Sequence, residues 1–214
     1  MALYTLSRNS EYKVSALLTT LTTDYGRISM HGVREVLLEQ QAAAIGLNLK
    51  KVFISKETSN QEYESKIRKA LEEYKLNEAF DVGFGDIFLE DLRKYREEQL
   101  AKVGLKGVFP IWKQDTFDLA HKFIDLGFKA IITCVDSKVM DGKFAGRDFD
   151  KSFLSELPSD VDPCGENGEF HSFVYEGPIF KKKIPHRKGE IVLRDKRFYY
   201  CDLLPLRDDV TRPQ

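Results

Sequence analysis

The stretch LKKVFIS (49–55), followed by EYESKIRKALEEYKL (62–76) and FDVGFGD (80–86), decides the fold. The first and third segments are short apolar runs, typical of strands buried on both faces of a sheet. In the middle segment, apolar residues recur every three or four positions, as expected for an amphipathic helix. A strand, a helix and a second strand in this order predict a right-handed crossover and parallel pairing.

The same alternation extends in both directions along the chain. Four helices are expected between the strands, and three of them end at Gly46, Gly104 and Gly127, because glycine readily adopts the left-handed conformation that closes a helix. Asp115 is expected to cap the helix that Gly127 ends. The sequence therefore predicts an α/β fold of Rossmann-like type, a mainly parallel sheet with helices on both faces. Its five strands are expected at 13–21, 49–55, 80–86, 106–112 and 128–136.

After residue 136 the pattern changes to a Gly-, Asp- and Pro-rich stretch followed by strand-like runs at 170–177 and 189–204. We therefore expect two regions. Residues 1–136 would form a nucleotide-binding α/β domain, and residues 137–214 a small α+β appendage with substrate-binding and catalytic residues, folded over the carboxyl edge of the sheet.

The composition excludes several classes of protein. Lys and Arg total 33 against 34 Asp and Glu, which argues against a protein whose main task is to bind nucleic acid. No apolar run approaches the roughly 20 residues that span a bilayer. The three cysteines are far apart and form no C-x-x-C pair, which argues against a disulfide scaffold and a zinc site. A cytoplasmic location is expected.

The first candidate binding segment is residues 29–32, Ser29, Met30, His31 and Gly32, directly before an expected helix. Ser29 is expected to cap that helix, and Gly32 permits close approach of the backbone. Free N–H groups at such a position can meet a phosphate or an adenine edge. The alternative is an ordinary capped turn with a partly exposed histidine.

The second candidate segment begins with Gly85 and Asp86 at the end of an expected strand. Asp86 is a candidate for a magnesium ion or a ribose hydroxyl. Glu90 and Arg93 follow on one helix face and are candidates for substrate binding, or else a surface ion pair of little energetic weight. The pattern lacks the third glycine of a dinucleotide-binding fingerprint.

The third candidate segment is the 162–171 loop, DPCGENGEFH, in which glycines separate two carboxylates, an amide and an imidazole. Such a group can bind a cation, orient an amine or act as a general base. Its candidate catalytic residues are Glu166, Asn167, Glu169 and His171. Cys164 is interpreted as a spectator thiol. The basic loop 181–189 is interpreted as a solvated hairpin, with an acidic protein or RNA surface as the alternative.

Several of these segments together resemble the diphthine–ammonia ligases and their uncharacterised bacterial relatives, which belong to the adenine nucleotide alpha-hydrolase superfamily. The resemblance extends from about residue 2 to residue 180, and GDIFLEDLR and GENGEFH are its most specific motifs. The segments that carry it are ISMHGVRE (28–35), GDIFLEDLRKYREEQL (85–100), GVFPIW (107–112), CVDSKV (134–139), FAGRDFD (144–150) and DPCGENGEFHSFVYEGPIF (162–180).

The resemblance implies an ATP- and magnesium-dependent ligase that adenylates a carboxylate and lets ammonia displace AMP. In archaea and eukaryotes the acceptor is diphthine on elongation factor 2, whereas bacteria lack diphthamide. Residues 29–32 with Gly85 and Asp86 would contact the nucleotide, and the four candidate catalytic residues would handle the acyl group and ammonium. One of the two glutamates, left open, would be the base.

The chain departs from the family at one motif. Members carry an early strand followed by SGGKDS, whose amides and lysine hold the ATP phosphates, and no SGGKDS occurs in this sequence. We interpret this as an N-terminally shortened chain, from a misassigned start or a shortened segment. A degenerate, non-catalytic module that binds a nucleotide or a protein is the alternative.

Overall fold

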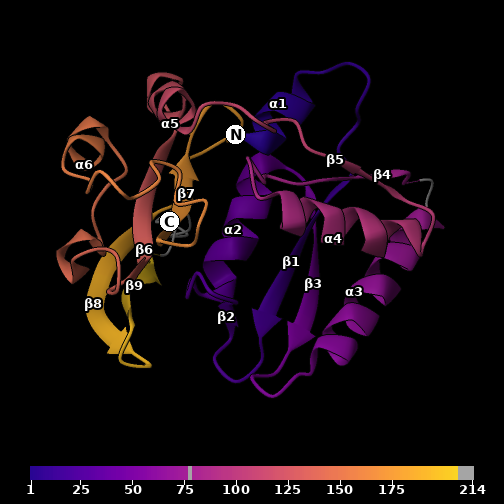
Figure 1. Ribbon diagram of the computed structural model, residues 1–214, viewed down its shortest axis with the longest axis horizontal. Helices are drawn as coiled ribbons and strands as arrows, with labels where there is room; N and C mark the ends of the chain where they lie inside the picture. The colour runs from indigo at the N-terminus through magenta and orange to yellow at the C-terminus, as the bar shows by residue number, and fades with distance from the viewer. Residues whose placement is uncertain (77–78, 207–214) are drawn as a thin grey trace, which may run out of the picture.

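The computed structural model describes residues 1–76 and 79–206, and its strands form three separate sheets (Figure 1). The first has the order β2-β1-β3, with β2 (Arg27–Ile28), β1 (Ala16–Thr22) and β3 (Asn48–Ile54). The second pairs β4 (Asp81–Gly83) with β5 (Lys106–Val108). The third has the order β7-β6-β9-β8, with β7 (Phe170–Glu176), β6 (Lys129–Asp136), β9 (Phe198–Pro205) and β8 (His186–Arg194).

The four predicted helices lie largely where the apolar periodicity places them. They are α2 (Glu35–Ile45), α3 (Asn60–Lys75), α4 (Glu90–Ala101) and α5 (Thr116–Asp125). The described residues also form α1 (Ala2–Ser7), α6 (Lys151–Ser155) and a 3₁₀ turn at Gly142–Phe144. Gly46 closes α2 in the left-handed conformation, and the Asp115 side chain accepts a hydrogen bond from Asp118 N (2.9 Å), so both predictions are confirmed. The prediction that Ser29 caps α2 was wrong, because α2 begins after Arg34 without a side-chain cap. None of the helices in the described part of the chain is both long and apolar enough to span a bilayer.

Parallel pairing is confirmed for two pairs of the predicted strands. β1 pairs with β3 over seven residues, and β4 pairs with β5 over three, both in parallel. The fifth predicted strand, β6, instead pairs antiparallel with β7 and β9, so placing it in the parallel sheet was wrong. The reason is that a run buried on both faces has the same apolar pattern at the centre of an antiparallel sheet.

A trough of about 840 Å³ separates β1 from β4. Leu17 and Leu18 of β1 line one side, Val82 of β4 lines the other, and Leu6 of α1 also contributes. Since the two parallel pairs lie on either side of this space, they do not join into the single sheet that the sequence predicts. The described residues therefore form a mixed α/β fold with two small sheets and a four-stranded antiparallel sheet near the C-terminus.

The main core lies under the antiparallel sheet, and α2 lies between this sheet and β1–β3 (Figure 1). Leu37 and Ala44 of α2 are buried in that core together with Ile131 of β6 and Phe153 of α6. The loop that carries residues 29–32 runs directly into α2, and this packing therefore places it beside β7.

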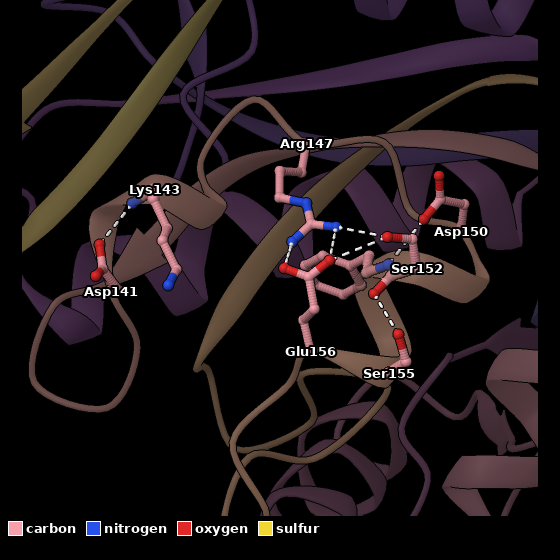
Figure 2. Close-up of polar contacts among 8 residues, drawn as sticks. Asp141, Lys143, Arg147, Asp150, Ser152, Ser155 and Glu156 are labelled. Carbon is pink, nitrogen blue, oxygen red and sulfur yellow. Dashed lines mark hydrogen bonds and ion pairs between the residues drawn. The ribbon is translucent and has the colours of Figure 1, made fainter.

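Side chains of the FAGRDFD motif (144–150) hydrogen bond with α6 and with the residue that follows it (Figure 2). The Arg147 guanidinium donates to both carboxylate oxygens of Glu156 (2.6 and 2.9 Å) and to Ser152 Oγ (3.2 Å). The Asp150 side chain caps α6 by accepting from Phe153 N (2.8 Å). These contacts give the motif a structural role, because they hold the buried Phe153 ring in place.

Candidate active site

The first and third candidate segments meet through two histidines. The rings of His31, in the loop before α2, and His171, on β7, lie with centroids 4.4 Å apart and planes inclined by 32°. Burial lowers the pKa of His171 to about 4, with a smaller contribution from His31, and burial also lowers the pKa of His31. Both imidazoles are therefore neutral at pH 7, and burial opposes their protonation.

The second and third candidate segments meet through Glu166. Its Oε1 accepts a hydrogen bond from Ile87 N (2.6 Å), in the residue after Asp86. Burial raises the pKa of Glu166, while hydrogen bonds from Ile87 and Phe88 oppose the rise, and the charge of Asp86 adds to it. The 162–171 loop thus touches both other segments.

Local backbone geometry shapes the 162–171 loop. Asp162 Oδ1 accepts from Cys164 N (2.9 Å) and Glu166 N (3.1 Å), which folds the chain back on itself. Gly165 has φ of +68°, and a Cβ there would lie 2.8 Å from Phe170 O, so glycine is required at this close approach. This turn brings Glu166 and Glu169 to the same part of the molecule.

Glu169 is 94% buried, with a relative exposure of 6%. Its Oε1 accepts from Asn167 Nδ2 (2.9 Å) and from Asp162 N (3.1 Å). Its Oε2 is buried and, within the described residues, has no hydrogen-bond partner. A buried carboxylate oxygen with spare acceptor capacity is costly to the fold and marks a place where a ligand N–H would be stabilised.

Asp86 is held by Arg96 rather than left free for a cation. Arg96 Nη2 donates to Asp86 Oδ1 (3.2 Å). Arg96 Nε lies 2.9 Å from Oδ2 as an ion pair, but without hydrogen-bond geometry, so these two buried atoms have no hydrogen-bond partner among the described residues. Among the described residues, no three His, Cys, Asp or Glu side chains come together in a way that could hold a metal ion. The residues at Asp86 therefore do not fit magnesium, and we derive no step through that ion.

The 29–32 segment has less free hydrogen-bonding capacity than its sequence predicts. The amides of Ser29, His31 and Gly32 donate to the carbonyls of Thr20 (3.3 Å), Ser29 (2.8 Å) and Ile28 (3.1 Å). The Ser29 hydroxyl is hydrogen bonded to Thr22 Oγ1 (3.0 Å), and the Met30 side chain is exposed.

The remaining candidates, Glu90 and Arg93, are at the start of α4. Glu90 pairs with Lys113 (3.0 Å), and both side chains are exposed. Arg93 pairs with Glu97 (2.9 Å) and stacks 4.7 Å from the centroids of Phe109 and Trp112. Glu90 and Arg93 therefore pair with different partners and not with each other.

Cys164 has the surroundings of an inert thiol. Its Sγ donates to Thr116 O (3.3 Å), and burial raises its pKa to about 12, with further contributions from Asp162 and Glu166. The thiolate needed for nucleophilic attack is therefore scarce at neutral pH.

Comparison with known proteins shows a distant family relation. Residues 115–202 match the family described as the diphthamide synthase C-terminal domain, and this range includes the whole 162–171 loop. The chain is a distant relative of the diphthine–ammonia ligases.

The human diphthine–ammonia ligase is 29% identical over 153 residues, 69% of this chain and 56% of the human protein. The enzyme of Schizosaccharomyces pombe is 28% identical over 154 residues, 70% of this chain and 25% of that protein. The bovine enzyme is 33% identical over 110 residues.

The chain thus spans about half the length of the human diphthine–ammonia ligase and a quarter of the length of the yeast one. Their shared name states the reaction of those proteins, the joining of diphthine and ammonia. What the relation establishes for this chain is kinship with a family of ligases.

One group beside the site was not a candidate from the sequence. Arg27 and Arg34 flank the 29–32 segment, and both bind the carboxylate of Asp202 on β9. The Tyr200 ring, also on β9, packs against Gly32 so closely that a Cβ there would lie 2.6 Å from Tyr200 Cδ1. In the sequence, the close spacing of the two arginines around SMHG was the only indication that this group exists. That spacing does not identify Asp202, 168 residues from Arg34, as their partner.

The buried His171 predicts acid sensitivity. Its folded pKa of about 4 lies below the unfolded value of 6.5, so the unfolded chain binds more protons between these pH values. The unfolding free energy therefore falls as the pH drops from 6.5 towards 4. Protonation of His171 in the unfolded chain accounts for a loss on the order of 2 kcal/mol. We expect His171→Gln to reduce the drop in urea unfolding free energy between pH 7 and pH 4.5. His121→Gln, at a partly exposed position on α5, should show the same drop in unfolding free energy as the unsubstituted protein. Equal drops in the unsubstituted protein and both variants would contradict the prediction.

Proposed function

We propose that this protein is an ATP-dependent amide-forming ligase that acts through an acyl-adenylate. The observation that carries the proposal is the position of the 162–171 loop, which touches His31 on one side and Ile87, next to Asp86, on the other. Three segments that resemble the ligases are thereby linked through one loop, although they are separated by up to 140 residues of chain.

The proposed chemistry has two steps. The acceptor carboxylate attacks the α-phosphate of ATP, releasing pyrophosphate and leaving a mixed anhydride with AMP. Ammonia then attacks the acyl carbon, the bond to AMP breaks, and the amide forms. A carboxylate by itself is a poor acyl donor, and AMP is a good leaving group. Because ammonium rather than ammonia dominates at neutral pH, a base must remove one proton before attack.

The contacts favour Glu169 over Glu166 as the group that binds ammonium and takes its proton. Glu166 Oε1 is already bonded to Ile87 N, whereas the buried Glu169 Oε2 is free to accept. Asn167 holds the other oxygen of Glu169 and so fixes its orientation. His171, neutral at pH 7 and two residues along the chain, would orient the acyl group or relay the proton.

ATP would bind with its base and ribose near residues 29–32 and Gly85. The phosphates need amides and a lysine, which SGGKDS supplies in the family and which this sequence lacks. The trough between β1 and β4 is lined by apolar side chains of both strands. We propose that an additional apolar strand occupies it in the active ligase, joins the parallel pairs into one Rossmann-like sheet, and presents the phosphate loop.

The assay uses two proteins: the chain itself, and a fusion that places an apolar strand and SGGKDS ahead of Met1. Each is mixed with ATP, magnesium, ammonium chloride and diphthine-bearing elongation factor 2, and AMP is measured by chromatography. We expect ammonium-dependent AMP formation by the fusion and negligible turnover by the chain alone. AMP formation that ignores ammonium or the acceptor would argue against an amide ligase.

In the fusion, Glu169→Gln is expected to lower the rate of ammonium-dependent AMP formation by about 100-fold, because the amide cannot accept the proton. Glu176→Gln, at the end of the strand that follows Glu169, is the matched control. Glu176 pairs with Lys129 (2.9 Å) at the far end of β7, so this variant should retain full activity. If both variants keep the parent rate, Glu169 is not the base.

A second candidate function is a non-catalytic module that binds a nucleotide or a protein. The observation that favours it is the 29–32 segment, whose amides are largely bonded within the protein. Under this alternative, the fusion would show no AMP formation, and ATP binding would not improve over that of the chain alone.

A further inference from the structure

The segment that carries His31 is a short hairpin closed by two arginines. Arg27 and Arg34 lie opposite each other in an antiparallel bridge, and Ile28 N donates to Val33 O (2.8 Å) between them. The turn of this hairpin is the 29–32 segment. Gly32 has φ of +69° and Met30 has φ of +64°, so the turn holds two residues in the left-handed region.

Both arginines of the hairpin bind one carboxylate on β9. Arg34 makes a two-point contact with Asp202, from Nε to Oδ1 (3.0 Å) and from Nη2 to Oδ2 (2.6 Å). Arg27 Nη1 donates to Asp202 Oδ1 (2.8 Å) and also to Gly32 O (2.6 Å), directly after His31. Partial burial opposes ionisation of Asp202, but the hydrogen bonds from Arg34 and Arg27 outweigh it and lower the pKa of this carboxyl to about 2.

A second contact from the same strand supports the hairpin. Tyr200 lies two residues before Asp202 and therefore on the same face of β9. Its ring fills the space beside Gly32 where a side chain would otherwise stand. The last strand of the antiparallel sheet thus holds the hairpin at both its base and its turn.

We infer that Asp202 is a positioning residue, which fixes the hairpin so that His31 lies against His171. Its significance for catalysis rests on the proposed function, but the positioning itself does not. Asp202 carries a permanent charge that two fixed guanidinium groups chelate, and bidentate contacts of this kind restrict orientation as well as distance. Among the described residues, the one hydrogen bond of the His31 ring is that of Nδ1 with Ser29 O in its own turn (3.2 Å), so the ring's position depends on how the hairpin is held.

The test is made on the ligand-free chain by NMR, with amide exchange and histidine titration as readouts. In Asp202→Asn, the amides of Ile28 and Gly32 are expected to exchange at least about tenfold faster, since charge-assisted bonds are lost. As His171 becomes solvated, its measured pKa should rise from about 4 towards 6.5. Arg34→Gln, at a partly exposed side chain, should produce the same two changes by removing the two-point contact.

Asp148→Asn is the matched control, because Asp148 pairs with Lys188 of the neighbouring strand β8 (3.0 Å) and touches neither histidine in the contacts described. It should change neither readout. Unaltered exchange and titration in both Asp202→Asn and Arg34→Gln would overturn the inference. A uniform rise of exchange across the whole antiparallel sheet would also overturn it, because Asp202 would then support global stability alone. Neither readout needs ATP or an acceptor, so failure of the ligase proposal would leave this result unaffected.

Discussion

Titration of ATP and magnesium into the 214-residue chain is expected to give an affinity no tighter than millimolar. A triphosphate carries several negative charges, and proteins offset their desolvation with fixed amides and a lysine. This sequence contains no SGGKDS, and the amides of Ser29, His31 and Gly32 are bonded to neighbouring carbonyls. Losing several charge-assisted bonds, each worth about 1.5–3 kcal/mol, weakens binding by about three orders of magnitude or more.

Isothermal calorimetry checks this expectation, with the strand-and-SGGKDS fusion as the second arm. The fusion should bind ATP at micromolar concentrations if its added strand enters the trough between β1 and β4. Micromolar affinity in the chain by itself would overturn the argument, because the described residues would then hold the phosphates without a glycine-rich loop.

Phe153→Ala is expected to lower the unfolding free energy by about 3–5 kcal/mol, enough to unfold much of a protein of ordinary stability. The Phe153 ring is completely buried in the main core. It meets Phe170 edge-on at 5.3 Å and Phe144 edge-on at 5.8 Å, and Phe149 lies 5.4 Å away. Removing it leaves a cavity that three rigid neighbours cannot fill.

Urea unfolding followed by circular dichroism measures the effect, and Phe117→Ala is the control. Phe117 is 59% exposed on α5, so its truncation should change stability by no more than about 0.5 kcal/mol. A loss below about 1 kcal/mol for Phe153→Ala would mean that the aromatic cluster repacks freely, contrary to its close edge-to-face geometry.

Local signals in the sequence predicted many of the individual elements. Gly46 ends α2 because a left-handed residue must follow the last turn, and Asp115 caps α5 because its side chain reaches an amide three residues on. These features depend on neighbours within one turn of chain and can be read directly. Pairing of β6 could not be read, because KAIITCVD is equally apolar whether its neighbours run parallel or antiparallel.

The candidate site divides in the same way. The chemistry of the 162–171 loop, with Glu166, Asn167, Glu169 and His171, is evident from residue types and glycine spacing, but nothing in the sequence distinguished the two glutamates. The structure distinguishes them by hydrogen bonding. Glu166 Oε1 accepts a hydrogen bond from Ile87 N, whereas the buried Glu169 Oε2 has no partner among the described residues.

By itself, the sequence predicted most of the strands and helices in their order, the parallel direction of the first four predicted strands, and the relation to a family of ligases. Only the tertiary structure decided that His31 meets His171, and that Asp202 anchors the hairpin carrying His31. In a strand whose side chains alternate between two faces, the sequence around an aspartate is the same whether its carboxylate faces water or two arginines. Its partners lie 168 and 175 residues away, and only the packing of β9 beside that hairpin brings the charges together.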